Sequence, residues 1–110
     1  MTDALPFEIT VDELHRRRAA GEDLFVLDVR QPDEYALCNL KDAVLLPLGE
    51  LPLRLEELDP QREIVVHCKM GGRSMQAVAF LRQQGFPKAR NLRGGILAWA
   101  DQFDPGMPRY

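Results

Sequence analysis

The sequence predicts an α/β domain in which a mainly parallel sheet of about five strands carries helices on both faces. At 110 residues, the chain has room for one hydrophobic core. Its apolar runs are too short for helices, and they alternate with segments whose apolar residues repeat at helical spacing. Strands that alternate with helices are joined by crossover connections, which make neighbouring strands parallel and place helices on both faces. We expect a ligand to bind where the carboxyl ends of these strands meet.

The first helix is predicted over residues 11–20. Thr10, with Glu13 three residues later, forms a capping-box pattern at its start, and Gly21 suits its end. The apolar run at residues 24–27 is too short for a helix and apolar enough for a strand buried on both faces. Polar side chains follow this run directly, at the carboxyl end of the predicted strand.

The middle of the chain predicts a helix, a strand and a second helical segment. Pro32 suits the first turn of a helix that runs to about Cys38, with acidic residues near its positive end. Residues 44–46 are apolar and predict a short strand. Three leucines then repeat at helical spacing between residues 51 and 58, which predicts a helix with one apolar stripe that ends before Pro60.

The second half of the chain repeats the alternation of strands and helices. Residues 64–67 predict a strand buried on both faces, and a helix over residues 74–84 follows after a short loop. Residues 89–92 predict a last, weak strand, and a final helix extends to residue 103. The inward face of the helix at 74–84 is predicted to carry Ala77, Val78 and Leu81.

Composition argues against two classes of function. The formal net charge is −3, whereas nucleic-acid-binding domains usually carry a dominant basic face, so we expect no nucleic-acid partner. No stretch approaches the ~18 apolar residues of a membrane span, and residues 1–4 have neither the basic start nor the apolar run of a targeting segment. We therefore expect a soluble cytoplasmic protein with no membrane contact. Its domain is predicted over residues 7–104, between an N-terminal segment at 1–6 and a C-terminal tail at 105–110.

Cys68 is the candidate nucleophile. It lies between a buried strand and the start of a helix, in a loop whose Gly71 and Gly72 allow backbone amides to converge on the sulfur. The positive end of the helix, Lys69 and Arg73 would all favour thiolate over thiol. The alternative is a buried cysteine at a strand end that packs as a small hydrophobic residue.

Three segments, in order, resemble the signatures of the rhodanese-like sulfurtransferase family. They are Asp-Val-Arg-Gln-Pro-Asp-Glu-Tyr at 28–35, the Cys-x4-Arg loop at 68–74, and Asn-Leu-Arg-Gly-Gly-Ile-Leu-Ala-Trp at 91–99. The tail at 104–110 further resembles the end of rhodanese domains fused to ubiquitin-activating-type adenylyltransferases. The chain departs from the family pattern at residues 41–42, where Lys-Asp stands in place of Pro-Gly, which puts the local turn in doubt. Cysteine phosphatases use a longer Cys-x5-Arg loop, so the spacing favours sulfur transfer over phosphoryl transfer.

The resemblance implies a chemistry and a set of site residues. A Cys68 thiolate would take the outer sulfur of an anionic donor such as thiosulfate, and a thiol, cyanide or a sulfur-carrier protein would then remove it from the persulfide. The resemblance also implies that Asp28 and Arg30 brace or line the loop. The alternative interpretation, that they form a structural ion pair outside the pocket, fits the sequence equally well. The predicted substrate-binding residues are Lys69, Met70, Gly71, Gly72, Arg73 and Ser74.

Three further expectations concern cofactors, Cys38 and partners. We expect no cofactor and no metal, because Cys38, His67 and Cys68 lack paired-ligand spacing. Cys38 could form a disulfide with Cys68, but a cysteine on a helix face in a reducing compartment is typically inert. His67 is expected to be a packed, hydrogen-bonded core residue. The competing function is a rhodanese-fold binding or sulfur-relay module that acts with a specific protein partner in cofactor biosynthesis.

Overall fold

The computed structural model describes residues 5–110; residues 1–4, part of the predicted N-terminal segment, lie outside the described residues. Within residues 5–110, five parallel strands form one sheet in the order β1-β5-β4-β2-β3. This arrangement confirms the predicted parallel sheet. The strands are β1 (Glu8–Ile9), β2 (Phe25–Asp28), β3 (Val44–Leu45), β4 (Ile64–His67) and β5 (Ala89–Leu92).

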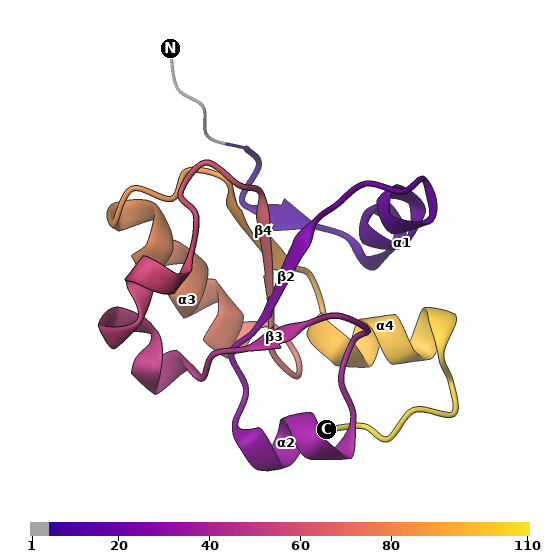
Figure 1. Ribbon diagram of the computed structural model, residues 1–110. Coiled ribbons are helices and arrows are strands. Elements are labelled where there is room, and N and C mark those ends of the chain that lie inside the picture. Colours follow the sequence, from indigo (N-terminus) through magenta and orange to yellow (C-terminus); the bar gives the residue numbers. More distant parts are fainter. Residues whose placement is uncertain (1–4) are drawn as a thin grey trace.

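Helices cover both faces of the sheet, as predicted. The helices α1 and α4 pack on one face, whereas α3 and two 3-10 helices, η1 and η2, pack on the other (Figure 1). The short helix α2 lies beyond the carboxyl end of β2 (Figure 1). The helical elements are α1 (Val11–Ala19), α2 (Pro32–Leu37), η1 (Leu48–Leu53), η2 (Leu55–Glu57), α3 (Gly72–Gln83) and α4 (Gly95–Phe103).

Two hydrophobic clusters hold these layers together, one on each face. In β4, Val66 belongs to the cluster under α3, while its neighbour Val65 belongs to the cluster under α1 and α4. Side chains of a strand alternate between the faces of a sheet, so a strand covered on both sides must be apolar at successive positions. This explains why the apolar runs at 24–27 and 64–67 show no alternation. Ala77, Val78 and Leu81 are fully buried, as predicted.

The predicted helix ends agree with the structure to within about two residues. The Thr10 hydroxyl accepts a hydrogen bond from the Glu13 amide at 3.1 Å and so caps α1. Beyond the end of α1, Gly21 has φ +86°, a left-handed conformation that glycine adopts at little cost. The helix predicted over residues 74–84 begins at Gly72, two residues early, so the last part of the cysteine loop already belongs to α3.

The prediction of one continuous helix between residues 51 and 58 was wrong. Two short 3-10 helices, η1 and η2, replace it. Pro52 lies inside η1, where it lacks the N–H that a continuous α-helix needs, and short 3-10 turns tolerate this. The leucine stripe is nevertheless buried: Leu51 and Leu58 belong to the cluster under α3, and Leu55 packs against it.

Strand β1 was not predicted. It has two residues, too few for any periodicity to be recognised. It pairs with β5, with Glu8 opposite Asn91, and Ile9 is 1% exposed.

Residues 41–42, where the family pattern has Pro-Gly, form a turn in which Asp42 has φ +63°. Asp is one of the few non-glycine residues that adopt this conformation, so the departure from the family pattern keeps the turn.

None of the helices described within residues 5–110 is long and apolar enough to cross a membrane. In the same part of the chain, no group of three or more His, Cys, Asp or Glu side chains is placed to hold a metal ion.

Candidate active site

Cys68 follows β4 directly, at the edge of the sheet where the carboxyl ends of the strands meet, and it is 1% exposed. The loop then turns through Gly71, which has φ +124° and precedes the first residue of α3. A side chain would be strained at this position. The turn brings the Gly71 amide to 3.1 Å and the Ser74 amide to 3.4 Å from the Cys68 sulfur. The sulfur therefore lies where backbone N–H groups converge, as predicted from the glycines.

Hydrogen bonds are the main influence that favours the thiolate. Burial of the sulfur raises the pKa of the Cys68 thiol. Hydrogen bonds from the Ser74 hydroxyl and from the amides of Ser74, Gly71 and Met70 outweigh burial, so this pKa lies below its ordinary value. The sequence had also assigned this role to the charges of Lys69 and Arg73. In the structure, neutral donors of the backbone and one hydroxyl make the largest contributions instead.

The start of α4 holds the other side of the loop. The amide of Ile96 donates to the Cys68 carbonyl at 3.0 Å, and the amide of Leu97 donates to the Lys69 carbonyl at 3.2 Å. Gly95 has φ +61°, and a Cβ there would lie 2.5 Å from the Lys69 oxygen and 2.7 Å from the Cys68 oxygen. The absence of a side chain at Gly95 lets α4 approach the loop. The first amides of α4 then hold the carbonyls of Cys68 and Lys69, which keeps the loop in the conformation that directs the amides of Gly71 and Ser74 at the sulfur.

Arg73 forms a two-pronged ion pair with Glu34 of α2. The two guanidinium nitrogens Nη1 and Nη2 lie 2.7 Å and 2.9 Å from the two carboxylate oxygens. The hydrogen bond from Arg73 lowers the pKa of Glu34 to about 2, although burial opposes this shift. From the sequence, Arg73 is a predicted substrate-binding residue, and Glu34 lies in the first turn of a predicted helix. The contact spans 39 positions, so no local pattern could indicate it.

A chain of polar side chains extends from Ser74 to β1. The Ser74 hydroxyl has three acceptors within reach: Asn91 Oδ1 at 2.5 Å, the Gly71 carbonyl at 3.2 Å and the Cys68 sulfur at 3.4 Å. Asn91 in turn donates from Nδ2 to a Glu8 carboxylate oxygen at 3.2 Å. Because the hydroxyl has one proton, Asn91 and Cys68 compete for it. From the sequence, Asn91 was placed only within the family signature at 91–99, without a role, and Glu8 was not predicted to belong to the site.

Residues 10–102 match the family model of the rhodanese-like domain. This chain belongs to the rhodanese-like family. It is 44% identical over 93 residues to a sulfurtransferase of Allochromatium vinosum, which covers 84% of this chain and 87% of that protein. The crystal structure of a rhodanese-like domain protein from Staphylococcus aureus superposes with a TM-score of 0.82 at 28% identity, over 96% of this chain and 99% of that one.

This chain is also similar to part of a much longer protein. A probable adenylyltransferase/sulfurtransferase of Mycobacterium tuberculosis, MoeZ, is 38% identical over 104 residues, which are 93% of this chain and 26% of that protein. The predicted resemblance to rhodanese domains, both single and fused, is thus confirmed. At the level of the family, the function is sulfur transfer.

Asp28 and Arg30 form a fully buried ion pair in this rhodanese-like domain. Arg30 Nη2 lies 2.8 Å from Asp28 Oδ2 and also donates to the Cys38 carbonyl at 2.7 Å. Arg30 Nη1 lies 3.4 Å from the Glu34 carbonyl. The pair therefore binds the backbone of α2, the helix that presents the Glu34 side chain to Arg73.

His67 is a core residue that touches both the loop and the buried ion pair. Its ring is fully buried, with Nδ1 3.2 Å from the Cys68 carbonyl and Nε2 3.6 Å from Asp28 Oδ2. Among the described residues, Nε2 has no hydrogen-bond partner. Burial lowers the pKa of His67, and the Asp28 carboxylate only partly opposes this. The ring is therefore neutral at neutral pH.

The structure separates the two cysteines. Cys38 ends α2 and packs in the cluster under α1 and α4, whereas Cys68 packs in the cluster under α3. The two clusters lie on opposite faces of the sheet. Both thiols are free, and a disulfide between them would require the chain to rearrange.

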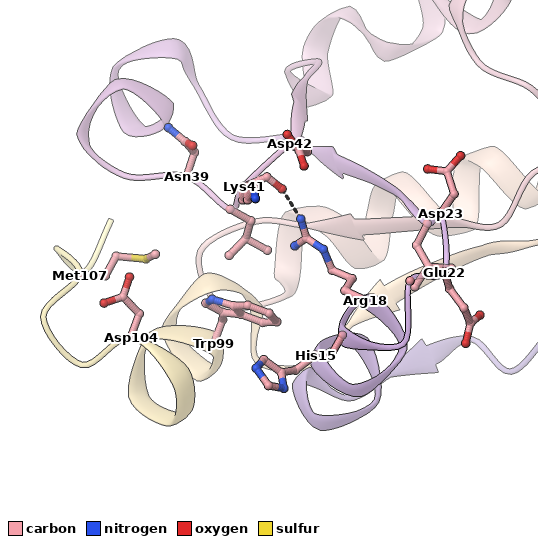
Figure 2. A pocket seen from close by; sticks show the side chains of 14 residues that line it. His15, Arg18, Glu22, Asp23, Asn39, Lys41, Asp42, Trp99, Asp104 and Met107 are labelled. Atoms are coloured by element: carbon pink, nitrogen blue, oxygen red, sulfur yellow. Dashed lines mark hydrogen bonds between the residues drawn. The ribbon is translucent and has the colours of Figure 1, made fainter.

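A cavity of about 830 Å³ lies between α1, α4 and the turn that contains Lys41 and Asp42 (Figure 2). Its lining comes from the end of α1, the turn at residues 39–42, α4 and the tail. None of the described residues that line it belongs to the loop at 68–74. Charges of both signs line it, among them Arg18, which donates to the Lys41 carbonyl. The cavity is thus distinct from the site around Cys68.

Proposed function

We propose that this rhodanese-like domain transfers sulfane sulfur through a persulfide on Cys68. The observation that carries the proposal is the convergence of two backbone amides and the Ser74 hydroxyl on one buried sulfur. These donors lower the pKa of Cys68, which raises the fraction of reactive thiolate near neutral pH. A thiolate needs no general base, because no proton has to be removed before it attacks.

In the first half-reaction the Cys68 thiolate attacks the outer sulfur of a donor. With thiosulfate, a new S–S bond forms to Cys68 and the original S–S bond breaks, which releases sulfite with its electron pair. The negative charge then lies on the outer sulfur of the persulfide. The donors that stabilise the thiolate are placed to stabilise this charge as well, and they do so without rearrangement.

In the second half-reaction an acceptor nucleophile attacks the outer sulfur, and Cys68 leaves as the thiolate. A cysteine whose pKa is lowered is a better leaving group, so the same hydrogen bonds favour both halves of the cycle. The acceptor in this step is a thiol or cyanide. With an adenylated sulfur-carrier terminus the roles are reversed: the outer sulfur of the persulfide attacks the acyl carbon and AMP leaves with the bonding electron pair. An added dithiol then reduces the S–S bond, which releases the carrier thiocarboxylate and the Cys68 thiolate. No cofactor other than the covalent sulfur takes part.

A sulfur relay to a protein partner is the second candidate function. Met70 in the loop is 68% exposed, and Met75 in the first turns of α3 is 49% exposed. Exposed methionines beside a reactive loop provide an adaptable apolar surface for a protein acceptor. The fused relative of the adenylyltransferase/sulfurtransferase type supports this reading.

Intact-mass measurement tests the persulfide. After incubation with thiosulfate and removal of excess reagent, the wild type should gain about 32 Da, and reduction by dithiothreitol should remove it. Cys38→Ala is the matched control and should gain the same mass, whereas Cys68→Ala should gain none. A wild type that stays unmodified with both thiosulfate and an organic thiosulfonate, or the same adduct on Cys68→Ala, would contradict the proposal.

A comparison of acceptors separates the two candidate functions. Turnover is measured with cyanide and, in the presence of dithiothreitol, with an adenylated sulfur-carrier protein. Reaction with the carrier that is lost in a Met70→Glu and Met75→Glu double variant, while cyanide turnover is kept, would favour the relay. Fast cyanide turnover with no carrier reaction would favour the small-molecule enzyme.

A further inference from the structure

Glu34 compensates the positive charge that the loop offers to a donor. Its side chain is 20% exposed and that of Arg73 is 36% exposed, and both carboxylate oxygens are engaged by the guanidinium. Lys69 is the remaining cation of the loop, and the thiolate of Cys68 is itself negative. With Arg73 paired, the site has little net positive charge left for an anion, although the sequence predicted Arg73 as a substrate-binding residue.

The position of Glu34 is determined by more than its ion pair. Its Oε1 also accepts from the Gln31 amide at 2.9 Å, which caps the start of α2. At the other end of α2, Arg30 donates to the Cys38 carbonyl at 2.7 Å and is itself paired with buried Asp28. The carboxylate is thus presented to Arg73 by a braced helix. Displacing it from Arg73 would break two charge-assisted hydrogen bonds.

A small donor that binds through Arg73 has to face this carboxylate. Thiosulfate carries two negative charges, and an alkanethiosulfonate carries one. Both react in the same way, by transfer of the outer sulfur to Cys68 and release of sulfite or sulfinate with the bonding electron pair. Repulsion by Glu34 grows with the charge of the donor, so removing the Glu34 charge should favour thiosulfate more than the thiosulfonate.

We propose that Glu34 is a specificity-determining residue that, by pairing with Arg73, makes the Cys68 site select singly charged or uncharged sulfur donors over small dianions. This inference rests on the proposed persulfide chemistry. It identifies the donor as an organic sulfane sulfur compound, such as a thiosulfonate or a thiol persulfide. Thiosulfate is then a slower substitute.

The experiment compares kcat/KM for thiosulfate and for methanethiosulfonate in the wild type and in Glu34→Gln. Glutamine keeps an oxygen that can accept from Gln31, so α2 remains capped, but it removes the charge. We expect kcat/KM for thiosulfate to rise about fivefold, mainly through KM, and the ratio of thiosulfate to methanethiosulfonate to rise about threefold.

Glu57→Gln is the matched control. Glu57 forms an equivalent two-pronged pair with Arg54, at 2.7 Å and 2.9 Å, on η2 and away from the loop. The control changes the net charge by the same amount and should leave the donor ratio unchanged. An unchanged ratio in Glu34→Gln, or an equal change in Glu57→Gln, would overturn the inference.

A measurement on the wild type alone provides a second test that does not depend on the folding of a variant. Salt weakens the attraction between an exposed cation and a dianion, so an uncompensated Arg73 would make kcat/KM for thiosulfate fall steeply with ionic strength. We expect no such fall in the wild type, and a steep fall would overturn the inference. If the wild type forms no persulfide with either donor, the proposed function itself fails, which is a different outcome from an unchanged donor ratio.

Discussion

The two cysteines of this rhodanese-like domain have similar burial but different surroundings. Cys68 is 1% exposed and Cys38 is 8% exposed, and Cys38 lies 3.8 Å from a guanidinium nitrogen of Arg30. That guanidinium is already paired with Asp28. Among residues 5–110, backbone amides are directed at the sulfur of Cys68, and no such hydrogen bond reaches that of Cys38. Neither burial nor a nearby arginine distinguishes the two thiols; the turn of the backbone at Cys68 does.

Selective alkylation gives the largest expected difference between the two cysteines. At pH 7 and in the native protein, iodoacetamide should label Cys68 about a hundred times faster than Cys38, although Cys68 is the less exposed. Peptide mass mapping over a time course measures the two rates. In concentrated urea the rates should become similar, since the turn is then lost. Faster labelling of Cys38 than of Cys68 in the native state would show that the backbone turn does not make Cys68 the more reactive thiol.

Gly95→Ala should abolish the special environment of Cys68. The added Cβ would meet the carbonyl oxygens of Lys69 and Cys68 at 2.5 Å and 2.7 Å, so either the loop or α4 has to move. We expect a loss of about 2 kcal/mol or more in the free energy of unfolding and at least about a tenfold slower labelling of Cys68.

Gly85→Ala is the control for backbone strain in this test. Gly85 has φ +94°, and a Cβ there would meet no atom within 4 Å. It should lose stability in urea titrations but keep the labelling rate of Cys68. Equal labelling rates in the two variants would show that the contact between α4 and the loop does not shape the site.

Local patterns predicted most of the fold for a physical reason. Burial on both faces produced the continuous apolar runs of β2 and β4, and glycines marked the ends of α1 and α3. Two features of the fold were not predicted correctly, because no local pattern of residues determines them. Strand β1 has two residues and is held by pairing with β5. The segment at 51–58 repeats leucines at helical spacing, yet Pro52 shifts it to 3-10 geometry.

The site was predicted less completely than the fold. Cys68 and the converging amides followed from a strand, two glycines and a helix start, which are neighbours in sequence. The partners of the loop come from distant segments: Glu34 reaches Arg73 across 39 positions, and Asn91 reaches Ser74 across 17. Such contacts depend on the packed tertiary structure. The resemblance to the family indicated the segments that contain them but not which atoms they join.

Ser74→Ala tests the contribution of the hydroxyl beside the sulfur. Loss of this hydrogen bond raises the pKa of Cys68, so the thiolate fraction at pH 7 falls. We expect labelling of Cys68 to slow about fivefold at pH 7 and to recover at higher pH, with Ser74→Thr restoring the wild-type profile. The pH dependence of iodoacetamide labelling measures this. A profile that does not move would show that the two amides suffice.

Asn91→Leu should give the smallest effect, with the opposite sign. Asn91 Oδ1 lies 2.5 Å and the Cys68 sulfur 3.4 Å from the Ser74 hydroxyl, so both are within hydrogen-bonding reach and compete for its single proton. A leucine of similar size offers no acceptor, so the hydroxyl is free to donate to the thiolate. The pKa of Cys68 should then fall further, and labelling at pH 6 should accelerate about twofold.

The double variant separates this effect from a general loosening of the site. With alanine at 74 there is no proton to redirect, so Asn91→Leu should then leave the labelling profile of Cys68 unchanged. If the labelling profile of Cys68 shifts to lower pH in Asn91→Leu but not in the double variant, then Asn91 and Cys68 compete for the proton of the Ser74 hydroxyl. Slower labelling in Asn91→Leu alone would mean that Asn91 orients the Ser74 hydroxyl toward Cys68 rather than competing for its proton. The difference between the two cysteines would then extend from the loop amides, through Ser74, to strand β5.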